Sequence, residues 1–66
     1  MSPASEHAEL STLRSQLEEL TQRVTTVAER YGTTPDSALA ADLFSAERAL
    51  VAARRSLDKA IGTVAP

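Results

Sequence analysis

The chain contains no cysteine and no tryptophan, and its 66 residues include one phenylalanine, one tyrosine and one histidine. Without cysteine, neither a disulfide bond nor a thiolate zinc site is available to stabilise so small a domain. The hydrophobic fraction is 42%, but twelve of these residues are alanine, so bulky core side chains are scarce. A chain of this length buries only about 60% of the surface that it exposes when unfolded. We therefore expect long-helix packing and association with another chain.

Long apolar runs and blocks of like charge are missing as well. No apolar run approaches the ~20 residues that a membrane-spanning helix needs, and the N-terminus lacks the basic and apolar regions of a signal peptide. The net charge is −2, with acidic and basic residues interspersed along the chain. This pattern predicts a cytoplasmic protein without membrane contact or a nucleic-acid-binding tail. Six arginines against one lysine, with abundant alanine, are typical of a GC-rich bacterial genome.

Two heptad seams are the strongest positive signal in the sequence. Their residues are spaced alternately by three and four positions, which is the pattern of a helix with one apolar stripe. The first seam is Leu10, Leu13, Leu17, Leu20, Val24, Val27 and Tyr31. The second seam is Leu39, Leu43, Ala46, Leu50, Ala53, Leu57 and Ala60. Two seams of equal length around a short break predict an all-α fold, an antiparallel two-helix hairpin resembling a coiled coil.

The hairpin forms one domain spanning residues 1–66. We expect helix one at about 4–31, a loop at 32–34, helix two at about 35–61 and a frayed C-terminus at 62–66.

Capping residues suggest these boundaries. Either Ser2, followed by Pro3, or Ser5 can cap the first helix. Gly32 suits the left-handed residue that closes a helix, and Pro35 suits the first position of the next one. A glycine at position 62 is expected to end the second helix.

The seams are expected to meet between the two helices. The predicted core of the hairpin is Leu10, Leu13, Leu17, Leu20, Val24, Val27, Leu39, Leu43, Leu50 and Leu57. Residues that lie at the same height on the two helices are expected to have numbers that add to 70, as in Leu20 with Leu50. A register in which these numbers add to about 66 is an alternative. Leucine opposite alanine favours interdigitation of large and small side chains. The alternative is that the alanines reflect only helix propensity.

A second apolar stripe on helix two predicts a contact outside the hairpin. Its residues are Ala40, Phe44, Val51 and Ile61. Aromatic side chains are enriched at the centres of interfaces, so we expect this stripe to pack against a second copy and form a four-helix bundle. In the alternative, Phe44 packs back over its own partner helix near residues 24–28.

One basic cluster predicts a different activity. Arg48, Arg54, Arg55 and Lys59 lie close together in sequence, and Arg48 and Arg55 are seven residues apart on one helix face. Such a face can follow a phosphate backbone or contact an acidic protein. Nearby acidic residues and the absence of stacking aromatics weigh against nucleic acid.

The sequence shows no arrangement of residues that predicts catalysis. No serine or threonine has a nearby base, and there is no glycine-rich phosphate loop. The di-iron bundle motif has a glutamate three residues before its histidine, but Ala4 occupies this position before His7. The motif is therefore missing, and we expect a solvated histidine. We expect no cofactor, no metal and no enzymatic activity. The sequence favours a small protein–protein interaction module, such as an adaptor, regulator or assembly element, that acts as a homodimer or binds another protein through helix two.

Overall fold

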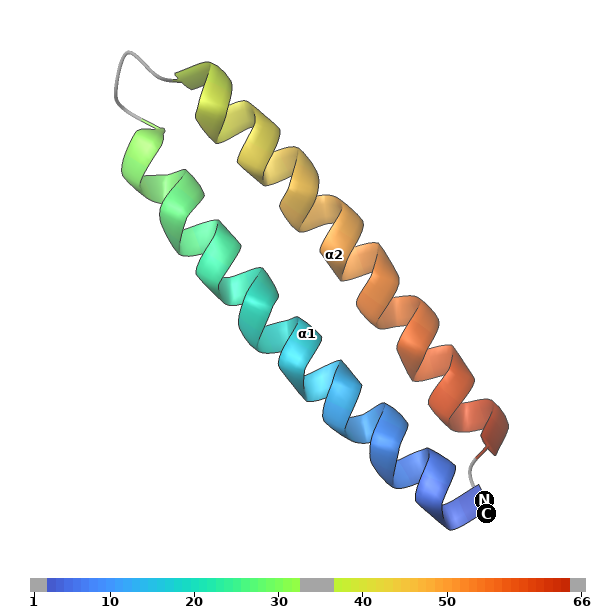
Figure 1. The fold of residues 1–66 in the computed structure, drawn as a ribbon. Helices are drawn as coiled ribbons and strands as arrows, with labels where there is room; N and C mark the ends of the chain where they lie inside the picture. Colours follow the sequence, from blue (N-terminus) through green and yellow to red (C-terminus); the bar gives the residue numbers. More distant parts are fainter. Residues whose placement is uncertain (1–2, 33–36, 65–66) are drawn as a thin grey trace.

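The computed structural model describes residues 3–32 and 37–64, and these residues form two helices packed side by side. Helix α1 spans Pro3–Tyr31 and helix α2 spans Ser37–Val64. The helices run in opposite directions, so the start of α1 and the end of α2 lie at the same end of the rod (Figure 1). The Cα atoms extend over 51 × 14 × 12 Å. The predicted all-α hairpin is thereby confirmed, and no strand occurs in the described parts of the chain.

Helix α1 ends at Tyr31, as the sequence predicts, but by a different turn. The amide of Gly32 donates a hydrogen bond of 3.4 Å to the carbonyl of Glu29, three residues earlier. No described glycine has a positive φ, so the expected left-handed closure at Gly32 does not occur. A tightened last turn satisfies one free carbonyl without that conformation. The predicted roles of Ser2 and Pro35 lie outside the described residues.

Helix α2 continues through Gly62 to Val64, so the expected helix end at this glycine is wrong. Glycine lowers the stability of a helix but leaves its hydrogen-bonding groups intact, and it ends a helix only when the following residues leave the helical path. The residue after it remains tied to the helix, because the hydroxyl of Thr63 donates a hydrogen bond of 3.1 Å to the carbonyl of Lys59.

Replacing Gly62 by alanine is expected to stabilise the protein. A Cβ atom at this position would meet nothing within 4 Å, so the change has no steric penalty. Helix propensity predicts a gain of roughly 0.5–1 kcal/mol, or several degrees in the thermal midpoint followed by circular dichroism. Gly32→Ala is the matched control, because Gly32 lies outside the helix. Equal shifts for the two variants would show that the helix does not extend to Val64 in solution.

Two polar contacts between the helices define their register. Arg14 pairs with Asp58, and the hydroxyl of Thr25 donates to a carboxylate oxygen of Glu47 at 3.2 Å. In both pairs the residue numbers add to 72, whereas the sequence analysis expects 70 or 66. The helices are therefore shifted by about two residues from the expected register, so Phe44 is level with Ala28 and Leu20 is level with Ala52.

Each helix is also rotated about its own axis away from the orientation that the seams predict. The buried hydrophobic side chains of the described residues are Ala28, 0% exposed, and Ala40, 4% exposed. By contrast, Leu13, Leu20 and Leu39, which were expected in the hairpin core, are 44%, 46% and 44% exposed. The two buried alanines lie near the connected end of the hairpin. The exposed leucines therefore lie to one side of the line of contact.

Candidate interaction surface

On α1, the large apolar side chains form two parallel columns beside the contact line. Residues seven apart in a helix lie almost above one another, so each heptad position forms one column. The inner column, Leu10, Leu17 and Val24, is half-buried. The outer column is Leu13, Leu20 and Val27, of which the two leucines are exposed. The outer column therefore contacts α2 least and faces away from the hairpin interior.

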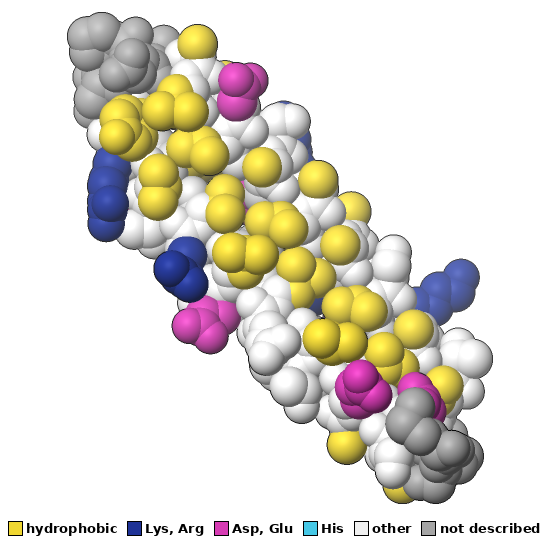
Figure 2. Space-filling model, viewed as in Figure 1, with side chains coloured by type: hydrophobic (Ala, Val, Ile, Leu, Met, Phe, Trp, Pro, Cys, Tyr) yellow, Lys and Arg dark blue, Asp and Glu magenta, His cyan; other side chains and the backbone are white. Residues whose placement is uncertain are grey.

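Helix α2 continues the same surface with smaller side chains. Its inner column, Leu43, Leu50 and Leu57, is half-buried. Its outer column begins with the exposed Leu39 and continues with Ala46, Ala53 and Ala60. In space-filling view, apolar side chains run over both helices along the whole rod, with charged groups mainly at its edges (Figure 2).

We call this surface the leucine face. It consists of Leu10, Leu13, Leu17, Leu20, Val24, Val27, Leu39, Leu43, Ala46, Leu50, Ala53, Leu57 and Ala60.

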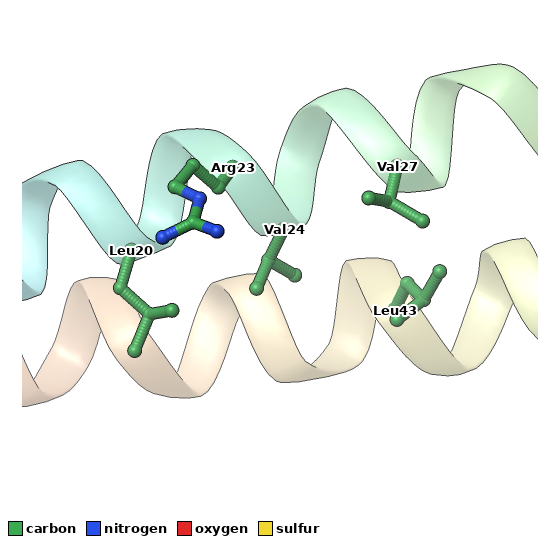
Figure 3. A pocket seen from close by; sticks show the side chains of 5 residues that line it. All are labelled: Leu20, Arg23, Val24, Val27 and Leu43. Carbon is green, nitrogen blue, oxygen red and sulfur yellow. The ribbon is translucent and has the colours of Figure 1, made fainter.

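A hollow of about 280 Å³ shows that the columns of both helices lie on the same side of the molecule. Leu20, Val24 and Val27 reach it from α1, Leu43 reaches it from α2, and Arg23 lies at its margin (Figure 3). Its lining is mainly apolar and it is open to solvent, so an apolar side chain from another molecule fits its chemistry.

Arginines mark the outer margin of the leucine face on α1. A second hollow of about 300 Å³ is lined by Arg23, Thr26, Val27 and Arg30. It shares Arg23 and Val27 with the first hollow, so it adjoins the leucine face. An apolar centre with charged groups at its rim is the usual composition of a protein–protein interface.

The contact line itself contains polar side chains. Arg14 binds Asp58 across the helices and also lies 3.6 Å from the carboxylate of Glu18. The hydrogen bond and the charge of Asp58 raise the pKa of Arg14, which remains positively charged at all relevant pH values. The Nε atom of Arg54 is buried without a hydrogen-bond partner among the described residues. Polar groups thus share the contact with apolar side chains, and the large side chains of Leu13, Leu20 and Leu39 are exposed beside it.

The stripe expected to contact a second copy lies closer to the interior of the hairpin. Ala40 is buried within the single chain, so it is not a contact residue on an open surface. Phe44, Val51 and Ile61 are half-buried. The register places Phe44 level with Ala28, in the neighbourhood that the alternative prediction names for this ring. The exposed large hydrophobic side chains among the described residues are Leu13, Leu20 and Leu39, and none of them belongs to this stripe.

The basic cluster is divided between two environments. Arg48, Arg55 and Lys59 are exposed, whereas Arg54 is half-buried and its Nε atom is buried. Only the first three side chains are therefore presented outward, and binding of nucleic acid or an acidic protein through the Arg48/Arg55 face stays a prediction.

Other classes of site find no support in the described residues. Residues 3–32 and 37–64 contain no group of three or more histidine, cysteine, aspartate or glutamate residues placed to hold a metal ion. His7 is half-buried near the start of α1. Within the same ranges, neither helix combines the length and apolar character that crossing a bilayer requires. The chain matches no protein-family model, no curated protein and no solved structure.

Proposed function

We propose that the protein is a small non-enzymatic interaction module that acts by helix packing and associates with itself as a four-helix bundle of two hairpins. The observation that carries this proposal is the leucine face, where Leu13, Leu20 and Leu39 are each more than 40% exposed. Fully burying one leucine contributes about 1.5–3 kcal/mol, so covering this face supplies a substantial driving force. Contiguous apolar surfaces of this kind mark interaction sites on small proteins.

The composition of the hairpin interior supports the same proposal. Among the described residues no large side chain is fully buried, and the buried hydrophobic residues are the two alanines Ala28 and Ala40. A hairpin stabilised by so small a core is marginal by itself, because helices gain most of their stability from packing an apolar face. Association supplies the missing contact, and the module then serves as an assembly element, an adaptor or a regulator.

The test is the dependence of association and stability on protein concentration. Sedimentation over a hundredfold range of concentration is expected to show a dimer, and the thermal midpoint is expected to rise with concentration because association stabilises the folded form. A monomer at every concentration, with a constant thermal midpoint, would contradict the proposal of self-association. It would leave binding to a different protein as the alternative role of the leucine face.

A further inference from the structure

The leucine face has an asymmetry that distinguishes between the ways in which two copies can meet. We infer that two hairpins pack leucine face against leucine face about a two-fold axis parallel to the helices, with the connections of both copies at the same end. In this arrangement α1 of each copy lies over α2 of the other. The inference rests on the proposed self-association through the leucine face and adds the orientation of the two copies.

Side-chain size is the first argument. The outer column of α1 is large throughout, whereas that of α2 is alanine beyond Leu39. A two-fold axis parallel to the helices leaves every residue at its own height, so the register of 72 also applies between the copies. Leu20 is then level, within one residue, with Ala53 of the second copy. In the same way, Leu13 is opposite Ala60 and Val27 is opposite Ala46.

The other face-to-face orientation has its two-fold axis perpendicular to the helices. It does not place the large side chains of α1 opposite the alanines of α2. There α1 lies over α1 and α2 lies over α2 of the second copy. Large side chains then oppose large ones on one side of the bundle, and alanines oppose alanines on the other. Cores pack best when large and small side chains face each other at an even helix spacing. The parallel axis satisfies this condition along the whole face.

Charge complementarity is the second argument. Arg30 follows Val27 by three residues and Asp42 follows Leu39 by three, so each flanks an outer column, and both are exposed. Their numbers add to 72, which places them at equal height on opposite edges of one hairpin. The parallel axis brings Arg30 beside Asp42 of the second copy, and it does so twice in the dimer. The perpendicular axis instead brings Arg30 towards Glu9.

The available area is consistent with a second copy as the occupant. A rod whose Cα atoms span 51 Å by 14 Å offers a face of roughly 700 Å². Standard stable interfaces bury about 800 Å² on each partner. Association with another hairpin of the same length covers this face from end to end, whereas a short peptide would leave much of it exposed.

Charge reversal distinguishes the two orientations. We expect Asp42→Arg to weaken dimerisation roughly threefold to tenfold in sedimentation experiments at low salt, because Arg30 then meets a like charge in two places. Glu9→Arg is the matched control and should leave the affinity nearly unchanged. Combining Arg30→Asp with Asp42→Arg should restore the affinity. If Asp42→Arg acted only through the dipole of its helix, the double reversal would instead lower the helix stability further, because Arg30 lies near the end of α1 and Asp42 near the start of α2.

A distance measurement gives an independent readout. Because the chain has no cysteine, Thr63→Cys provides a single site for a spin label at the end of α2. The inferred dimer places the two labels at the same end, about 20 Å apart, or two helix diameters. The perpendicular axis separates them by most of the rod length of 51 Å.

Each result has a distinct meaning. A dimer with widely separated labels, or one weakened by Glu9→Arg and not by Asp42→Arg, would overturn the orientation while leaving self-association intact. A dimer insensitive to both reversals would also overturn it. A protein that remains monomeric at every concentration would overturn both the orientation and the proposed self-association.

Discussion

Leu20→Glu is expected to abolish dimerisation at micromolar concentration. Leu20 lies near the middle of the leucine face, is 46% exposed in the single chain and lines the hollow between the helices. Association would bury a carboxylate without a partner in each copy and would lose the burial of two leucines. Together these effects amount to at least about 3 kcal/mol, or more than a hundredfold in Kd. Sedimentation equilibrium measures this change directly.

Gln22→Glu is the control for this variant. Gln22 is exposed and lies two residues from Leu20 on the same helix. Its replacement by glutamate introduces the same charge outside the leucine face. We expect it to remain a dimer with nearly the affinity of the unmodified protein. If Leu20→Glu also dimerises with unchanged affinity, the leucine face is not the surface through which the protein associates.

The second large effect is expected from Ala28→Leu, which acts on the hairpin itself. Ala28 is completely buried between the helices near the connected end of the hairpin. Three additional carbon atoms would force the helices apart or push the side chain out of its favoured rotamers, which lowers the free energy of unfolding by about 1–3 kcal/mol. Chemical denaturation followed by circular dichroism measures the loss.

Ala52→Leu provides the comparison for the Ala28 substitution. Ala52 is exposed on α2, so the added carbon atoms reach solvent, and the stability should change by no more than about 0.5 kcal/mol. A variant Ala28→Leu that is as stable as this control would show that the helices do not approach closely at Ala28 in solution.

The sequence predicts the helices and their pairing well. Both heptad seams lie within α1 and α2, because hydrophobic periodicity depends only on the chain itself. Periodicity shows which residues share a face, but not what covers that face. Periodicity therefore predicts that the seams meet inside one hairpin, whereas Leu13, Leu20 and Leu39 are exposed in the single chain.

A signal for the correct register is nevertheless present in the sequence. Arg14 with Asp58 and Thr25 with Glu47 both have numbers that add to 72, and both pairs join complementary groups. Glu18 and Arg54 have the same sum and opposite charges. Reading complementary polar residues across the two halves, besides the apolar seams, would have indicated both the register and the rotation of the helices.

The polar contacts between the helices have a consequence for evolution. Arg14, Thr25, Glu47 and Asp58 hold each helix at one rotation about its axis, with the leucines turned to one side. Exchanging these four for well-packed aliphatic residues would give the helices an apolar line of contact in the same rotation, which would stabilise the single hairpin while the leucine face stayed open. The stability of the single hairpin can therefore evolve through these four positions without any change to the leucines.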